Sequence, residues 1–105
     1  MIKRIVRLCF KEEFTDDFEA IFIDSKSRIR AFKGCLHLEL CKDLNDKRIY
    51  FTISFWENED ALQMYRNSEL FKDTWASTKK LFEEKPMAFS LLPFQTVESD
   101  DINRH

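Results

Sequence analysis

Hydrophobic and polar residues alternate along four stretches of the chain, and this alternation predicts four β-strands. The stretches are residues 3–10, 35–42, 49–56 and 87–94. A period of two places successive side chains on opposite faces of a strand. In residues 49–56, Ile and Phe alternate with Tyr, Thr, Ser and Trp, so we expect the two faces of this strand to differ in chemistry.

The segments between these strands have helical spacing. From Phe14, apolar residues recur at intervals of three, four and seven as far as Ile29, after a potential cap at Thr15. Gly34, the only glycine, is expected at a positive φ or a close backbone approach. A second helical region begins at Asn58. Ser68 caps it again, so we expect a kink or two successive helices, which end near Phe82, before Pro86.

This order of elements predicts an α+β fold, a ferredoxin-like βαββαβ sandwich with an antiparallel sheet and its helices on one face. The more apolar strand faces should meet the helices: Val6, Leu8, Phe10, Leu36, Leu38, Leu40, Ile49, Phe51, Ile53 and Phe55. The mixed faces should point outward: Arg7, Cys9, His37, Glu39, Tyr50, Thr52, Ser54 and Trp56. An uncovered face with aromatic rings and opposite charges predicts a specific homodimer interface that contains bridging water molecules.

Length and charge limit the possible partners. The 105 residues suggest one domain, residues 1–94, followed by a polar tail, residues 95–105. A net charge of −2 without a basic stripe argues against nucleic acid. No apolar leader or membrane-spanning run is visible, so no membrane partner and a cytoplasmic location are expected. Three cysteines without a CxxC pair indicate core thiols in a reducing compartment.

Aromatic residues are the main candidates for a site. Eleven Phe, two Trp and two Tyr indicate either a core packed with Phe or a pocket lined with rings. Tyr65 and Trp75 each combine a ring with a polar group and are the candidate catalytic residues. They should face Phe51 and Phe55, and the wall for the substrate is completed by Phe10 and Phe22. Plain packing remains the alternative.

Other reactive groups are weaker candidates. Cys35 and Cys41 lie ~20 Å apart along one strand, and the third strand should separate them from Cys9. We therefore do not expect the three cysteines and His37 to form a tetrahedral metal site. His37 could act as a base near neutral pH, but beside Glu39 at a subunit contact it fits a hydrogen-bonded interface residue better.

Three segments, FKGCLHLEL (32–40), YFTISFWENEDAL (50–62) and YRNSELFKDTWASTKKLFEEKP (65–86), resemble the antibiotic biosynthesis monooxygenase (ABM) family. The resemblance covers residues 3–94 and implies a dimeric α/β barrel of two face-to-face sheets. It also implies a monooxygenase-like enzyme that needs no metal, flavin or other cofactor and acts on a small aromatic, quinol-type or polyketide-like substrate. A non-enzymatic dimeric module that binds a small apolar ligand, or only scaffolds, remains open.

The family also has a haem-degrading branch, and the sequence departs from its pattern. That branch needs an Asn in the first strand, a Trp in the middle helix and a His that ligates iron. The matching positions hold Val6, Tyr65 and Trp75. An indole has no free lone pair for iron, so we expect the protein neither to ligate nor to degrade haem.

Overall fold

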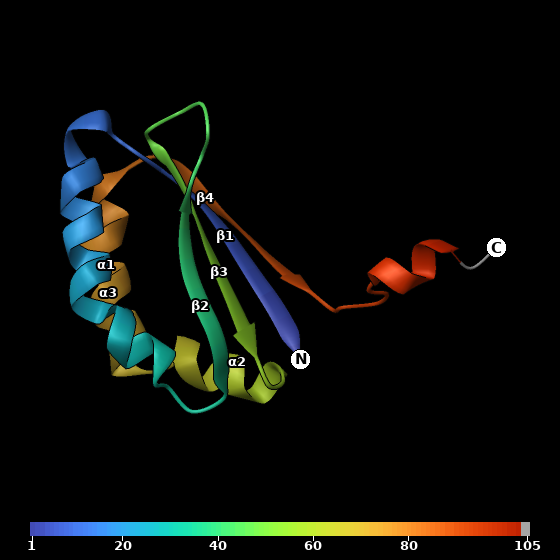
Figure 1. Cartoon of the computed structure of the whole chain (residues 1–105). Helices are drawn as coiled ribbons and strands as arrows, with labels where there is room; N and C mark the ends of the chain where they lie inside the picture. Colours follow the sequence, from blue (N-terminus) through green and yellow to red (C-terminus); the bar gives the residue numbers. More distant parts are fainter. Residues whose placement is uncertain (104–105) are drawn as a thin grey trace.

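Four antiparallel strands form one sheet, and the three α-helices cover one of its faces (Figure 1). The computed structural model describes residues 1–103. The elements are β1 (Ile2–Phe10), η1 (Glu12–Phe14), α1 (Thr15–Arg30), β2 (Cys35–Lys42), β3 (Ile49–Trp56), α2 (Glu59–Arg66), α3 (Glu69–Thr78), η2 (Lys79–Leu81), β4 (Phe82–Leu91) and η3 (Ser99–Asn103). The strand order is β2-β3-β1-β4. This arrangement confirms the ferredoxin-like α+β fold.

The middle helical region is split in two, as its sequence predicts. The Asn58 side chain accepts a hydrogen bond from the Ala61 amide at the start of α2. The Ser68 hydroxyl accepts one from the Phe71 amide at the start of α3. Each cap satisfies a helical N–H that has no partner within its own helix, so the chain turns between the two helices at Ser68.

The last strand starts earlier than the sequence suggests. We expected the helix to continue to Phe82 and the strand to begin at residue 87, but α3 ends at Thr78 and β4 begins at Phe82. Phe82 stacks on Phe10, with ring centroids 5.1 Å apart. Pro86 lies inside β4, which is an edge strand, and an edge strand tolerates the missing N–H of proline.

The predicted orientation of β3 is wrong. Leu8 pairs with Tyr50 and Ile2 pairs with Trp56, and directly paired residues point to the same side of a sheet. Tyr50 and Trp56 therefore face the helices, where each is only 1% exposed. Their polar atoms have partners, because the Tyr50 hydroxyl donates to the Glu19 carboxylate and the Trp56 indole donates to the Ser54 hydroxyl at 2.9 Å.

The inverted strand makes the open face of the sheet more apolar than predicted. Ile53 pairs with Ile5, and Ile5 pairs with Phe89, so the three side chains cross the open face together. Phe51 and Phe55 lie on the same face as Ile53. Phe89 is 46% exposed and Leu91 is also 46% exposed. His37 and Glu39 point outward as predicted and lie 3.0 Å apart.

The start of β2 also differs from its predicted alternation. The ladder between β2 and β3 shifts register between Cys35 and His37. As a result, Cys35 is buried against Trp56, whereas Leu36 is exposed. Leu36 was expected to face the helices, and this prediction is wrong because the bulge moves one residue out of the period of two.

Gly34 has the conformation that its sequence position suggests. Its φ is +87°, and a Cβ built there would lie 2.5 Å from the Cβ of Ala61. The Gly34 carbonyl also accepts a hydrogen bond from the Glu57 amide at 2.9 Å. The loop before β2 can therefore pack against α2 only because residue 34 has no side chain.

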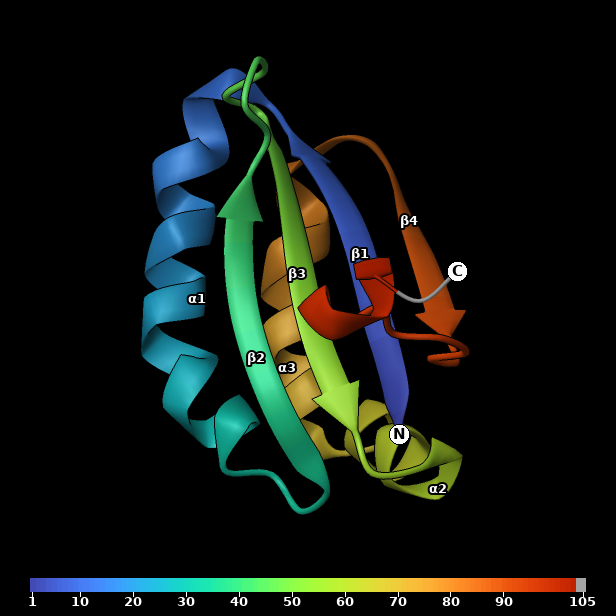
Figure 2. The ribbon, with the colours of Figure 1, turned by 45° about the vertical axis from the view of Figure 1, so that its right-hand side comes forward.

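The C-terminal segment leaves the sheet on the side opposite the helices (Figures 1 and 2). Phe94 in this segment is 91% exposed. The predicted polar tail, 95–105, contains η3, and its last two residues lie outside the described part of the chain. Within residues 1–103, no helix has the length and apolar character needed to cross a bilayer.

Candidate functional site

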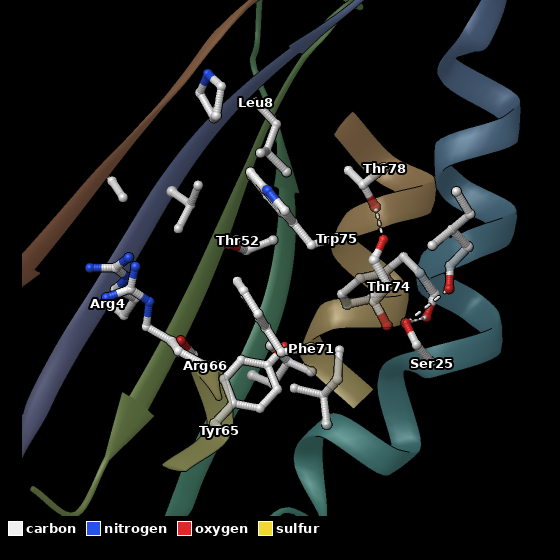
Figure 3. A pocket seen from close by; sticks show the side chains of 18 of the residues that line it. Arg4, Leu8, Ser25, Thr52, Tyr65, Arg66, Phe71, Thr74, Trp75 and Thr78 are labelled. Atoms are coloured by element: carbon white, nitrogen blue, oxygen red, sulfur yellow. Dashed lines mark hydrogen bonds between the residues drawn. The ribbon is translucent and has the colours of Figure 1, made fainter. Parts of the chain in front are cut away.

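A cavity of about 320 Å³ lies between the sheet and the helices (Figure 3). Leu8 and Phe18 of one core cluster line it, and so do Trp56 and Leu62 of the other. The cavity therefore separates the two clusters. Small-molecule sites have volumes of roughly 300–1,000 Å³ and mostly apolar walls, so the cavity can hold a small, largely apolar molecule.

Aromatic rings form a continuous wall along the helical side of the cavity. Tyr65 stacks on Trp56 at 4.9 Å and meets Phe71 edge-on at 5.3 Å. Phe71 lies almost parallel to Trp75, with centroids 5.9 Å apart. Phe71 and Trp75 are four residues apart in α3 and so share one helix face. This spacing turns both rings toward the cavity, as the close-up shows (Figure 3).

The polar groups of Tyr65 and Trp75 remain available to a ligand. Within residues 1–103, neither the Tyr65 hydroxyl nor the Trp75 indole N–H has a hydrogen-bond partner. Burial raises the pKa of Tyr65 to about 12, with a smaller contribution from Cys35. The phenol is therefore protonated at neutral pH, so it can donate a hydrogen bond but is not a base.

The cavity brings together only part of the predicted site. Phe22, Tyr65 and Trp75 line it. Phe10 does not belong to the lining; it is fully buried and stacks on Phe18 at 4.2 Å. The expectation that Phe51 and Phe55 face Tyr65 and Trp75 is wrong, because both Phe residues lie on the open face of the sheet.

Two arginines at one end of the cavity were not among the predicted site residues. Arg4 of β1 and Arg66 of α2 both line the cavity, and their side chains approach each other in the close-up (Figure 3). The Arg4 guanidinium donates to the Ser90 hydroxyl at 2.8 Å. The sequence shows Arg4 as a charge on the same strand face as Val6 and Leu8, but it does not show that Arg66 lies beside it.

The model of the antibiotic biosynthesis monooxygenase family matches residues 1–77. The chain belongs to this family. The matched region includes Arg4, Phe22, Tyr65, Arg66 and Trp75, and thus most of the cavity wall. No curated protein sequence is significantly similar to the chain.

Solved structures support the ABM fold. One is a crystal structure of an antibiotic biosynthesis monooxygenase, with a TM-score of 0.85, 19% identity, and coverage of 90% of this chain and 100% of that chain. A protein from Mycobacterium tuberculosis has a TM-score of 0.84 and 18% identity, covering 92% and 98% of the two chains. A conserved protein from Methanosarcina mazei Go1 has a TM-score of 0.83 and 16% identity, covering 86% and 89%. At these identities the likeness shows the fold alone.

The cavity of this ABM domain is suited to binding more than to acid–base chemistry by its own side chains. Among the described residues that line it, none is Asp, Glu, His or Cys. His37 lies on the open face beside Phe55, with ring centroids 4.6 Å apart. Cys9 and Cys35 are buried free thiols whose pKa is raised by that burial. No three metal-binding side chains of residues 1–103 gather at one place.

Proposed function

We propose that this ABM domain is a monooxygenase-like enzyme that needs no cofactor and acts on a small aromatic, quinol-type or polyketide-like substrate. The cavity of about 320 Å³ carries the proposal, because it combines an apolar wall with the unpartnered polar groups of Tyr65 and Trp75. Membership of the family supports a monooxygenase-like role. The substrate would lie between the sheet and the aromatic wall.

The proposed reaction, written for a quinol, oxidises a ring C–H group to a carbonyl. A phenolic O–H bond breaks, its proton goes to solvent, and the resulting quinolate gives one electron to O₂. The two radicals combine into a C–O bond, and the resulting hydroperoxide loses water. One oxygen atom of O₂ stays in the product and the other leaves as water, so the substrate is oxidised and O₂ is reduced.

The side chains of the cavity would assist this reaction by positioning and shielding. Tyr65 and Trp75 would donate hydrogen bonds to oxygen atoms of the substrate or the intermediate. Phe22 and Phe71 would exclude water from the radical pair. No general base is assigned to the chain, so the substrate itself must be acidic enough to ionise.

We also propose that the domain acts as a homodimer in which two open sheet faces pack together. The apolar row of Ile5, Ile53 and Phe89 supports this pairing, because an exposed apolar patch on a sheet favours association. The free thiols fit a reducing, cytoplasmic location. Trp75 occupies the haem-ligand position of the related branch, which supports the expectation that haem is not bound.

A non-enzymatic dimeric module that binds a small ligand remains the second candidate. The specific observation in its favour is the cavity lining, which in residues 1–103 contains no carboxylate, imidazole or thiol. A pure scaffold fits less well, because a scaffold has no need of an open cavity in its core.

Oxygen uptake in the presence of a chelator distinguishes the two candidates. Purified protein is added to a panel of aromatic quinols, and the oxygen electrode is read against the uncatalysed rate. The enzyme should consume one O₂ for each new C–O bond formed, and Tyr65→Phe and Trp75→Phe should slow it. Quinols that bind without any increase in oxygen uptake would favour the binding module.

A further inference from the structure

Two positive charges converge at one end of the apolar cavity. Arg4 comes from β1 and Arg66 from the last turn of α2, and both side chains line the cavity (Figure 3). Arg4 is half-buried, whereas Arg66 is exposed, so this end of the cavity opens to solvent. Burial lowers the pKa of Arg4, and the neighbouring charge of Arg66 lowers it further.

No acidic side chain neutralises this pair. Within residues 1–103, neither arginine has a carboxylate within ion-pair distance, and the hydroxyl of Ser90 is the side-chain partner of Arg4. Placing two like charges together beside an apolar cavity is unfavourable unless an anion compensates them. The position of Arg66 in the last turn of α2 suits the helix dipole, but it gives no reason for Arg4 to lie beside it.

Three other arginines of residues 1–103 have a carboxylate partner. Arg7 pairs with Glu84, Arg28 pairs with Asp24, and Arg48 pairs with Asp46. Arg30 donates to the carbonyl of Cys35 at 2.8 Å. Within residues 1–103, the arginines without a carboxylate partner are thus Arg4, Arg30 and Arg66, and of these Arg4 and Arg66 line the cavity.

We infer that the cavity selects an organic anion, with an aromatic body between the sheet and the helices and a carboxylate held by Arg4 and Arg66. The planar guanidinium matches a carboxylate in two parallel hydrogen bonds. Most N–H donors of both arginines are free for such bonds. This specificity rests on the proposed function, since it names the substrate class of the same cavity.

Calorimetric titration with two matched probes tests the anion preference. The probes are 2-naphthoate and its neutral amide, 2-naphthamide, which share one ring system and differ in charge. The wild type should bind the carboxylate about tenfold or more tightly than the amide, as expected for charge-assisted hydrogen bonds. Arg4→Gln and Arg66→Gln should each reduce this ratio at least about threefold, because the carboxylate loses more binding than the amide does.

Two further variants control the experiment. Arg66→Lys keeps the charge and should retain part of the preference. Arg28→Gln removes an exposed arginine that does not line the cavity and should leave the ratio unchanged. Arg66→Gln changes an exposed residue and so tests the inference even if Arg4→Gln fails to fold.

The outcomes separate this inference from the proposed function. Equal affinity for both probes overturns the anion preference but leaves the cavity as a ligand site. Failure of both probes to bind overturns the inference and also removes the support for a substrate cavity. A carboxylate preference that is lost in both Gln variants, without oxygen uptake on the quinol panel, supports the anion site and contradicts the oxygenase.

Discussion

Tyr65 presents a ring to its neighbours and a hydroxyl without a partner in the described part of the chain. Its ring stacks on Trp56 and meets Phe71 edge-on. Replacement by Phe preserves these contacts and removes only the hydroxyl. We expect Tyr65→Phe to change the free energy of unfolding by less than ~1 kcal/mol, as measured by urea denaturation. An aromatic ligand that bears an oxygen should nevertheless bind more weakly, whereas one without oxygen should not.

Trp75 and Trp56 form a matched pair of indoles that both line the cavity but differ in burial. Trp56 is enclosed and hydrogen-bonded to Ser54, so Trp56→Ala should cost about 3–5 kcal/mol. Trp75 is half-buried and borders the cavity, so Trp75→Ala should cost clearly less. Urea denaturation of both variants gives the comparison. Equal losses would show that Trp75 is ordinary core rather than the wall of a site.

Tyr65 and Trp75 could be predicted as cavity-lining residues, because each combines an apolar ring with a polar group and lies at helical spacing on the inner face. Arg4 could not be assigned in the same way. A lone arginine in a strand pattern usually indicates a solvated face. Its relation to Arg66 depends on the contact between β1 and α2, which joins residues far apart in the sequence.

At the scale of elements, β3 shows that the period of two identifies the two faces of a strand but not which face meets the helices. The strand lies between β2 and β1 and has large apolar residues on both faces, so alternation reveals two faces without saying which one meets the helices. The pairing of Leu8 with Tyr50 decides the orientation. Trp and Tyr can then fill the core because Ser54 and Glu19 satisfy their polar atoms.

The loop before β2 provides a test of close packing between elements. Gly34→Ala places a residue with a side chain at φ +87°, with its Cβ 2.5 Å from that of Ala61. We expect a loss of more than ~1 kcal/mol in unfolding free energy, measured by urea denaturation. Ala61→Gly removes the overlap but not the backbone strain, so the double variant should lose less than the sum of the two. Strict additivity would contradict the contact.

The hairpin between β2 and β3 should contribute stability that depends on pH. Arg48 lowers the pKa of Asp46 from 3.8 to about 2, through side-chain and backbone hydrogen bonds to the carboxylate. A carboxyl with a depressed pKa in the fold stabilises it fully above the unfolded value. This contribution is then lost as the pH falls through the folded value.

Asp46→Asn should therefore destabilise the protein at neutral pH, and its difference from the wild type should shrink between pH 3.8 and about 2. Urea denaturation at a series of pH values measures the difference. Arg48→Gln removes the guanidinium but keeps the backbone N–H, and it serves as the control, since Asp46→Asn in that background should show a smaller pH dependence. A difference that stays constant down to pH 2 would exclude the Arg48 effect.

At the scale of the whole molecule, the order of strands and helices sufficed to predict the fold. The antiparallel sheet with helices on one face follows from a split βαβ order, whatever the orientation of any one strand. The start of β4 could not be predicted, because Leu81 and Phe82 continue the helical spacing of α3. Phe82 becomes a strand residue because it pairs with Phe10 of β1 and stacks on its ring.

The open face of the sheet leads to the last prediction, which concerns assembly. Trp56 was expected on this face, but it lies in the core, so Ile53 in the apolar row is the better probe. At micromolar concentration the wild type should sediment at twice the chain mass of 12.7 kDa. Ile53→Asp should shift it toward monomer, because the contact would bury an unpaired charge.

Ile23→Asp is the matched control, since it makes the same change at an exposed position of α1, away from the open face. This variant should remain dimeric and should unfold at the same urea concentration as the wild type. The segment after Leu91 projects from the side of the open face (Figure 2), so a partner bound there would also meet Phe94. A wild type that sediments as a monomer would rule out the dimer. A dimer that survives Ile53→Asp unchanged would place the contact on another surface.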